Sequence, residues 1–165
     1  MERDRGTGEI DLRRLDTWMA LALDEARAAA HHNEVPVGAI VVRRRDGEIV
    51  AARHNERETS NDPTAHAELL ALRDAARVEA TWRLDDHIVV VTLEPCPMCA
   101  GAIWAARARL LVFGAADPKA GAAGTLYNFA SDPRLNHTTD VMRGVRGSEC
   151  AALLADFFAS RRTAP

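Results

Sequence analysis

The strongest constraint on the fold is a strand, helix and strand pattern between residues 88 and 113. Ile88 to Leu93 is a continuous, largely β-branched run, which is typical of a strand buried on both faces. A helix is predicted from Pro97 to Ala106, and a second apolar strand from Leu110 to Phe113. Because the helix carries the chain back across the sheet, the two strands are predicted to be parallel. Open α/β sheets place their functional sites at the carboxyl ends of such strands.

The segments before this unit add helices and an antiparallel hairpin. Apolar residues recur at helical spacing from Leu12 to His31, and a further helix is predicted from Thr64 to about Val78. Val37 to Val42 and Glu48 to Ala52 are short apolar runs joined by Asp46-Gly47, which predicts a hairpin. With a short strand near Val141, the chain is predicted to be an α/β protein with a mixed sheet of about five strands.

Length, charge and cysteine usage limit the kind of protein. The chain has 165 residues, which suits a single domain over residues 12–162, and the polar residues 1–11 are expected to form a flexible tail. The net charge is -3, so a nucleic-acid site would have to be a local basic patch. No apolar run is long enough for a membrane span and no signal peptide is recognisable, which favours a cytoplasmic protein.

Two short segments together contain the parts of a zinc site. His66 offers an imidazole, and Cys96 and Cys99 offer two thiols. Zinc takes nitrogen and thiolate ligands in tetrahedral geometry, and a catalytic site leaves the fourth position to water. A Cys-x-x-Cys pair alone would equally suit a redox site or half of a structural zinc site. In combination with the histidine, the order His-x-Glu, then Pro-Cys-x-x-Cys, matches the pattern of the zinc deaminases.

Glu68 is predicted to be the proton carrier of this site. Asp62-Pro63-Thr64 has the composition of a helix start, so His66 and Glu68 are expected near a helix N-terminus. Residues two apart point to different sides of a helix, so the two side chains should not be equivalent ligands. The histidine is therefore predicted to bind metal, and the carboxylate to act as general acid and base.

These motifs belong to a longer resemblance, which runs from about Trp18 to Arg162. The chain resembles the bacterial tRNA-specific adenosine deaminases of the cytidine deaminase-like superfamily. The segments that carry the resemblance are Glu34 to Ala39, His54-Asn55, Asp62 to Glu68, Thr92 to Ala102, Phe113 to Gly124, Leu135 to His137 and Glu149 to Phe158. The resemblance implies a three-layer α/β/α cytidine deaminase-like fold, one Zn2+ per chain and a homodimer. It also implies that the enzyme converts adenosine to inosine at the wobble position of a tRNA anticodon stem-loop.

The resemblance also implies which residues contact the RNA. Val35 and Pro36 would line the base pocket, while the Asn55 amide either reads a purine edge or caps a loop. Asp117 would lie near the sugar of the target nucleotide, where a carboxylate can accept a hydrogen bond from a ribose 2′-hydroxyl. Lys119 follows in the same segment and is the only lysine of the chain, although a chance surface position explains it as well.

Two further contacts are implied nearer the carboxyl end. Asn136-His137 resembles an RNA-contacting pair, but it also suits a turn before the next strand. The final helix carries apolar residues at helical spacing, with Cys150 to Phe157 expected in the core. Phe158 with Arg161-Arg162 would combine a stacking surface with phosphate-pairing charge.

Some features have a purely structural interpretation. The run Arg43 to Arg45 adjoins a hairpin turn and is interpreted as solvated. Trp18, Trp82 and Trp104 are expected in the core or in an interface, and Trp104 differs from the residue expected at its position in the family.

Three other functions remain open from the sequence. A guanine deaminase, or another enzyme of free nucleobases, shares the two zinc motifs closely but needs neither the Asp117 segment nor the Phe157-Phe158 pair. A cytidine-type deaminase is compatible with the zinc motifs alone. A structural zinc module would use four protein ligands and leave Glu68 without a role.

Overall fold

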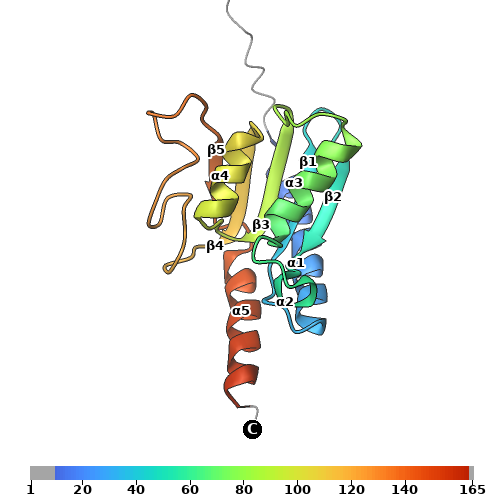
Figure 1. The fold of residues 1–165 in the computed structure, drawn as a ribbon, viewed down its shortest axis with the longest axis vertical. Helices are drawn as coiled ribbons and strands as arrows, with labels where there is room; N and C mark the ends of the chain where they lie inside the picture. Colours follow the sequence, from blue (N-terminus) through green and yellow to red (C-terminus); the bar gives the residue numbers. More distant parts are fainter. Residues whose placement is uncertain (1–9, 164–165) are drawn as a thin grey trace, which may run out of the picture.

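The computed structural model describes residues 10–163 and contains a mixed five-stranded sheet in the order β2-β1-β3-β4-β5 (Figure 1). The strands are β1 (Gly38–Arg43), β2 (Ile49–His54), β3 (His87–Leu93), β4 (Leu110–Ala115) and β5 (Asp140–Arg143). Strand β1 pairs antiparallel with β2 and β3, whereas β3 with β4 and β4 with β5 are parallel. The predicted hairpin, parallel pair and strand number are confirmed.

Helices cover both faces of the sheet, which gives the predicted three layers. The helices are α1 (Leu12–His31), α2 (Arg57–Ser60), α3 (Ala67–Val78), α4 (Pro97–Ala105) and α5 (Gly147–Arg162). Alternate strand residues divide the core, because successive side chains point to opposite faces. Val89 and Val91 pack with α3 and α4, while Ile88 and Val90 pack with α1 and with Cys150 of α5. Within residues 10–163, no helix combines the length and apolarity needed to cross a bilayer.

Helix α3 starts three residues later than the sequence predicts. Asp62 does not cap the helix, because its Oδ1 accepts hydrogen bonds from the backbone N–H and the hydroxyl of Thr64, at 2.8 and 2.7 Å. This closes a separate turn. His66 then takes the N-cap position in an extended conformation, with φ -78° and ψ 148°. The imidazole therefore lies at the N-terminus of α3, near the carboxyl end of β3.

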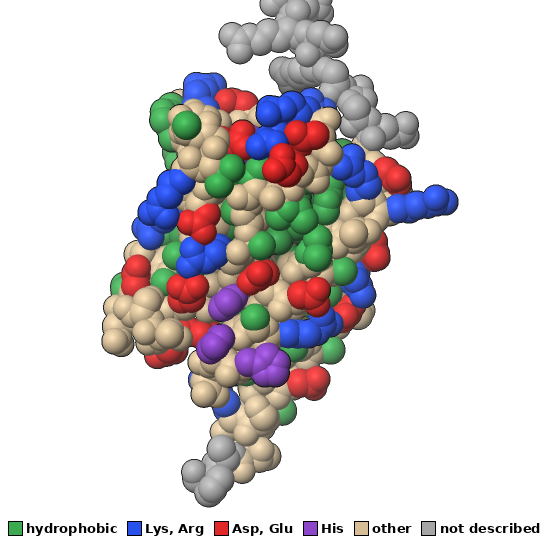
Figure 2. All heavy atoms as spheres, turned by 90° about the vertical axis from the view of Figure 1, so that its right-hand side faces the viewer, with side chains coloured by type: hydrophobic (Ala, Val, Ile, Leu, Met, Phe, Trp, Pro, Cys, Tyr) green, Lys and Arg blue, Asp and Glu red, His purple; other side chains and the backbone are tan. Residues whose placement is uncertain are grey.

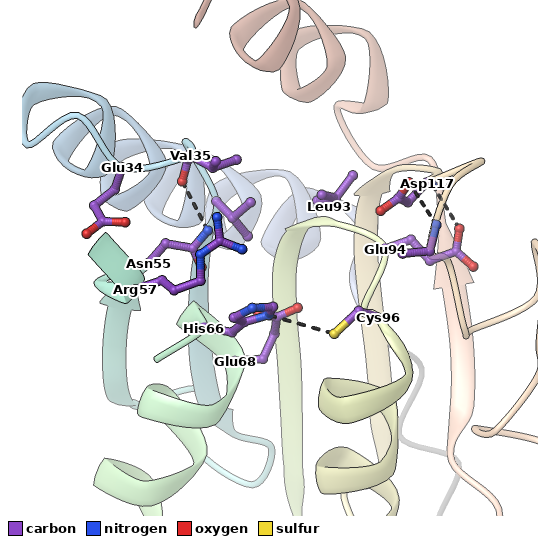
Figure 3. Close-up of a pocket in the computed structure, with 12 residues that line it drawn as sticks. Glu34, Val35, Asn55, Arg57, His66, Glu68, Leu93, Glu94, Cys96 and Asp117 are labelled. Atoms are coloured by element: carbon purple, nitrogen blue, oxygen red, sulfur yellow. Dashed lines mark hydrogen bonds between the residues drawn. The ribbon is translucent and has the colours of Figure 1, made fainter. Parts of the chain in front are cut away.

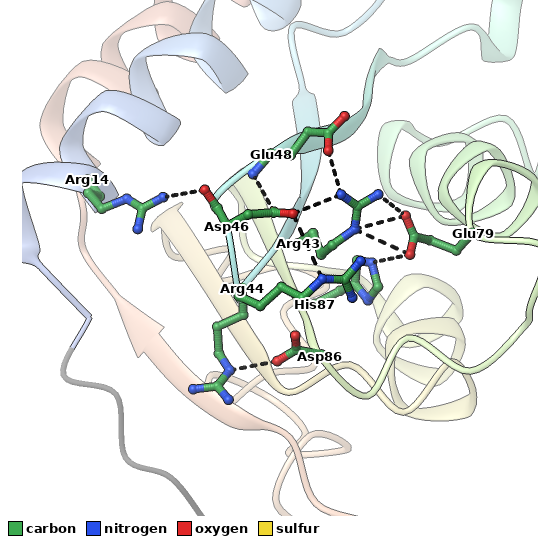
Figure 4. Close-up of polar contacts among 9 residues, drawn as sticks. Arg14, Arg43, Arg44, Asp46, Glu48, Glu79, Asp86 and His87 are labelled. Carbon is green, nitrogen blue, oxygen red and sulfur yellow. Dashed lines mark hydrogen bonds and ion pairs between the residues drawn. The ribbon is translucent and has the colours of Figure 1, made fainter.

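The interpretation of Arg43 as part of a solvated turn is wrong. Arg43 is the last residue of β1, and its side chain is only 12% exposed, since it ion-pairs with Glu79 at the end of α3 and with Asp46 and Glu48 of the turn (Figure 4). His87 lies buried beside them, with Nε2 3.6 Å from a carboxylate oxygen of Glu79. This polar cluster connects the hairpin to the C-terminus of α3, whereas His66 lies at the N-terminus of the same helix.

The last helix is less buried than its periodicity suggests. Only Cys150 is fully buried, Leu153, Leu154 and Phe157 are half-buried, and the helix runs past the sheet (Figure 1). Its first turn packs closely, because a Cβ added at Gly114 would lie 2.3 Å from the Cys150 sulfur. The prediction that Cys150 to Phe157 forms core is therefore correct for Cys150, and in part for Leu153 and Leu154, which are half-buried against the core. Of the three tryptophans, Trp18 is buried, whereas Trp82 is exposed.

Charges on the β2 side of the molecule are closely mixed. Figure 2 shows basic and acidic side chains interleaved over that face. Arg53 is an example, since its guanidinium pairs with Asp74 at 2.7 Å and with Glu56 at 2.8 Å. Such pairs leave no extended basic surface on the face shown, in agreement with a net charge of -3.

Candidate metal centre and substrate pocket

The structure brings His66, Cys96 and Cys99 together at the start of two helices. Their ligand atoms all lie within 4.8 Å of one another, and His66 Nδ1 lies 3.7 Å from Cys96 Sγ and 3.5 Å from Cys99 Sγ. Zinc bonds of about 2.3 Å to sulfur and about 2.0 Å to nitrogen place tetrahedral ligands roughly 3.5 Å apart. The three side chains therefore fit a zinc ion, with one coordination position left for water.

The thiols are supported by the start of α4. Cys96 is the N-cap of that helix, Pro97 occupies its first turn and Cys99 follows one turn later. Hydrogen bonding from the Cys99 thiol, then from His66 and from the backbone N–H of Cys99, lowers the pKa of Cys96 to about 4. The same interaction raises the pKa of Cys99, since one thiol must keep its proton while the other is ionised. Zinc binding to both thiolates therefore releases a proton.

Glu68 lies in the same cavity, and its pKa is raised above the ordinary value of a carboxyl group. Its side chain is buried, and burial is the main reason why its pKa rises to about 7, although the nearby His66 works in the opposite direction. A carboxyl group that titrates near neutral pH is suited to take a proton in one step and to return it in the next.

The cavity next to these groups has a volume of about 190 Å3 (Figure 3). It opens at the carboxyl ends of β3 and β4, as predicted for a parallel pair. Its lining comes from five segments of the sequence, and the residues are Glu34, Val35, Val37, Asn55, Arg57, His66, Glu68, Leu93, Glu94, Cys96, Asp117 and Ala120. The cavity thus combines apolar side chains with His66, Cys96 and Glu68.

Comparison with known proteins agrees with this geometry. Residues 12–115 match the family model of the cytidine and deoxycytidylate deaminase zinc-binding region. A tRNA-specific adenosine deaminase of Bacillus subtilis (strain 168) is 46% identical over 147 residues, which cover 89% of this chain and 90% of the relative. The corresponding enzyme of Agrobacterium fabrum is 45% identical over 145 residues, which cover 88% and 94%. This chain belongs to the tRNA-specific adenosine deaminase family.

Solved structures of deaminases share the fold of this chain. A structure from a study of A-to-I editing by tRNA:A34 deaminases has a TM-score of 0.79 and 44% identity, and the match covers 83% of this chain and 98% of that one. Guanine deaminase from Nitrosomonas europaea has a TM-score of 0.74 at 28% identity, covering 87% and 84%. The predicted cytidine deaminase-like fold and the zinc cofactor are confirmed, and the chain is a zinc-dependent deaminase.

Three of the predicted substrate residues of this family member line the cavity. Asn55 is held in place, because its Nδ2 donates to the carbonyl of Val35 at 3.1 Å and its Oδ1 accepts from the N–H of Ala67 at 2.9 Å. It thus ties the segment before β1 to the first residue of α3. Asp117 also lines the cavity, and its Oδ1 accepts from the N–H of Lys119 at 2.9 Å. Pro36 is buried, and Val37 lines the cavity in its place.

The structure places the other predicted residues away from the cavity of their own chain. Lys119 is exposed on the segment after Asp117. Asn136 accepts a hydrogen bond from Arg107 at 3.1 Å, and His137 Nε2 lies 3.5 Å from the Ala108 carbonyl. Both precede β5, which is parallel to β4, so they lie at the amino ends of these strands. His66, Cys96 and Cys99 lie at the other end, where β3 and β4 finish. Phe158 is 44% exposed on α5.

Two buried carboxylates at the cavity were not identified from the sequence. Glu94 accepts hydrogen bonds from the N–H groups of Asp117, Ala123 and Thr125, at 3.0 to 3.1 Å, and from the Thr125 hydroxyl at 2.5 Å. Burial opposes its charge, but these hydrogen bonds, with that of the hydroxyl the largest, hold its pKa below the ordinary value. Glu94 thereby anchors the segment that carries Asp117.

Glu34 has the equivalent role on the other side of the cavity. Its carboxylate accepts from the N–H of Glu58 at 3.2 Å and from the N–H and hydroxyl of Thr59 at 2.6 and 2.7 Å, which fixes the short helix α2. Arg57 of that helix lines the cavity. The only signal for both acids in the sequence is their position, directly before Val35 and directly before Pro95.

Proposed function

We propose that this chain deaminates adenosine to inosine at the wobble position of a tRNA anticodon stem-loop. One observation carries the proposal: the buried carboxyl group of Glu68 lines the same cavity as His66 and Cys96, which are grouped with Cys99 in the arrangement of a zinc site. The relatives named tRNA-specific adenosine deaminase support the substrate, because the similarity extends over 88 to 89% of this chain and includes the segments beyond the zinc motifs.

His66, Cys96 and Cys99 hold the zinc ion in this proposal. A zinc ion held there would supply a water of lowered pKa as the nucleophile for C6 of adenine. Glu68 takes the proton of that water, delivers it to N1 of the ring and assists the departure of ammonia. Water is thus added and ammonia lost, and a carbonyl replaces the amino group at C6. Glu68 alternates between its charged and neutral forms as it accepts and returns the proton.

The cavity walls select the base and its sugar. A base within a stem-loop must leave its stack to reach a recessed site, which costs least in a single-stranded loop. Val35 and Leu93 offer apolar walls to the ring, and Asn55 has a second amide N–H to offer to a purine edge. Asp117 lies at the rim, where its second carboxylate oxygen can accept from a ribose hydroxyl.

The enzyme acts as a homodimer in this proposal. A groove of about 360 Å3 between α3 and α4 is lined almost entirely by apolar side chains, namely those of Leu69, Leu72, Ala76, Trp82, Leu84, Ala102, Ala105 and Ala106, together with Arg73. Trp82 is 61% exposed there, and Trp104 Nε1 on α4 is buried with no acceptor among residues 10–163. A second copy seated on this face would cover the apolar groove.

The dimer would also explain the position of Asn136 and His137. They lie at the opposite edge of the sheet from the cavity of their own chain, and Arg107, the partner of Asn136, extends from the end of α4. In a dimer built on α4, these residues serve the cavity of the partner. Phe158 and Arg161 extend the RNA-binding surface beyond the Val35 side of the cavity. Arg161 donates a hydrogen bond to the carbonyl of Asn33, which lies two residues before Val35. An enzyme of tRNA with these free thiols works in the reducing cytoplasm.

One assay tests the proposal against the alternatives. The protein is incubated with an anticodon stem-loop that carries adenosine at the wobble position, and separately with guanine, cytidine and free adenosine, and inosine or the other products are measured by mass. Inosine in the stem-loop alone is expected. Faster turnover of guanine would establish the nucleobase deaminase, turnover of cytidine the cytidine-type enzyme, and tightly bound zinc without any turnover the structural module.

A further inference from the structure

The segment between β4 and β5 displays two aromatic rings beside the cavity. Tyr127 is 57% exposed and Phe129 is partly exposed, and their rings stack with centroids 5.9 Å apart and an angle of 22° between the planes. Trp82 is the other large aromatic residue on a loop among residues 10–163, and it lies in the apolar groove, whereas Tyr127 and Phe129 line no such groove. Exposed aromatic faces of this kind are the usual platform for unpaired bases.

Hydrogen bonds fix this pair relative to the cavity. The N–H groups of Leu126 and Tyr127 both donate to the Gly121 carbonyl, at 2.9 and 3.2 Å, and Phe129 donates to Ala122 at 3.0 Å. Gly121 directly follows Ala120, which lines the cavity. The buried carboxylate of Glu94 also holds this segment, because it accepts hydrogen bonds from the N–H groups of Ala123 and Thr125. The rings are therefore carried by a fixed turn, one backbone hydrogen bond away from the cavity wall.

The charges around the segment favour a nucleic acid. The guanidinium of Arg143 lies against the segment, since a Cβ added at Gly124 would be 2.5 Å from its Nη2. Among residues 10–163, neither Arg143 nor Lys119 forms an ion pair, whereas Arg27, Arg43, Arg53 and Arg83 all pair with acids. Aromatic rings next to unpaired cations suit bases and phosphates.

We propose that Tyr127, backed by Phe129, stacks on an unpaired base adjacent to the target adenosine, and that Arg143 and Lys119 pair with the neighbouring phosphates. The proposal rests on the proposed function, because it concerns the RNA that enters the same cavity. When the target base leaves the loop for the cavity, its neighbour loses a stacking partner. The Tyr127 ring takes that place and thereby lowers the cost of extruding the target.

A stem-loop with 2-aminopurine beside the target adenosine provides a direct test, because stacking on an aromatic ring quenches this base. The wild-type protein is expected to quench it on binding. Tyr127→Ala should abolish the quenching and weaken binding roughly tenfold, which is a moderate effect for one stacked base. Tyr127→Phe keeps a ring and should behave as the wild type. Leu126→Ala removes exposed apolar surface from the neighbouring position and should change neither quantity.

Charge is tested by the salt dependence of the same binding. Arg143→Gln should weaken binding and reduce the slope of log K against log salt by about one phosphate contact. Zinc content and melting temperature are measured for every variant, and both should match the wild type.

The outcomes separate the two proposals. If the wild type binds and edits the stem-loop but Tyr127→Ala does so equally well, with unchanged quenching, the stacking proposal is wrong and the function stands. If Tyr127→Ala instead converts a dimer to a monomer in sedimentation, the pair is an interface between copies. If the wild type neither binds nor edits the stem-loop, the proposed function fails, and the stacking proposal fails with it.

Discussion

At the scale of single residues, Glu68 is distinguished from the ligands by where its carboxylate lies. It is buried in the cavity beside His66, yet the ligand group within 4.8 Å consists of His66, Cys96 and Cys99. Glu68→Gln keeps the shape of the side chain and removes its ability to carry a proton. We expect the variant to retain zinc and to lose activity by a factor of at least about 100. Zinc analysis and single-turnover deamination check this, and loss of zinc would make Glu68 a ligand.

Glu94 acts through the loop that it holds. Glu94→Gln replaces one accepting oxygen by an amide that donates, so hydrogen bonds from Asp117, Thr125 or Ala123 must be lost in the buried site. We expect KM for the stem-loop to rise at least about tenfold, while zinc content stays the same. Thr125→Val is the matched control, since it removes only the hydroxyl contact and should have a smaller effect. An unchanged KM in Glu94→Gln would show that the loop does not need this anchor.

At the scale of elements, the polar cluster of Arg43, Glu79 and His87 links the hairpin to α3 and makes stability depend on pH. Hydrogen bonding from Arg43 lowers the pKa of Glu79, so its contribution is fully present above the unfolded value of 4.5 and is lost as pH falls below 4.5 and through the lower folded pKa. Burial lowers the pKa of His87, so below the unfolded value of 6.5 the unfolded chain binds more protons and stability falls. Both effects act in the same direction.

Melting temperature measured between pH 7 and pH 4 should therefore decrease towards acid. His87→Leu should flatten the part of the curve nearest pH 6.5, because the variant has no proton to bind there. Glu79→Gln should flatten the part near pH 4.5 and lower the melting temperature at neutral pH, because Arg43 loses a charged partner. Curves that coincide with the wild type would contradict a role for this cluster.

The same elements show which features a sequence can predict. The strands and the grouping of His66 with Cys96 and Cys99 were predictable, because each depends on local patterns such as the run Ile88 to Leu93 or the spacing of Cys96 and Cys99. The burial of Arg43 depends on Glu79, 36 residues away, and the role of Glu94 depends on residues 23 to 31 positions later. Helix α5 has correct periodicity but extends beyond the sheet, so its last apolar residues have little to pack against.

At the scale of the whole molecule, the proposed dimer connects the cavity of one chain to Asn136 of the other. Chains with Glu68→Ala and chains with Asn136→Ala should each be weakly active alone. When the two are mixed and allowed to exchange subunits, activity should return, because one cavity then combines its own Glu68 with the partner's intact Asn136. No recovery on mixing would mean that Asn136 acts within its own chain or not at all.

The groove between α3 and α4 can be tested separately. Trp82→Asp places a charge in the proposed interface and should convert dimer to monomer in sedimentation at micromolar concentration. Leu12→Asp is the matched control, since Leu12 is equally apolar and exposed but lies outside the groove. If the wild type sediments as a monomer, the dimer proposal is wrong.

The convergence of two helix starts has a consequence for how the domain holds together. Helices α3 and α4 run in the same direction on one face, and His66 and Cys96 are their N-caps. Their aligned dipoles repel each other at close range, and both positive ends meet at one point. Thiolates placed there would offset this repulsion, and a cation bound by His66 and the two cysteines would join the two helices. This helix layer would then be held by metal at the end where the substrate enters, whereas at the other end the ion pair between Arg43 and Glu79 ties α3 to the hairpin.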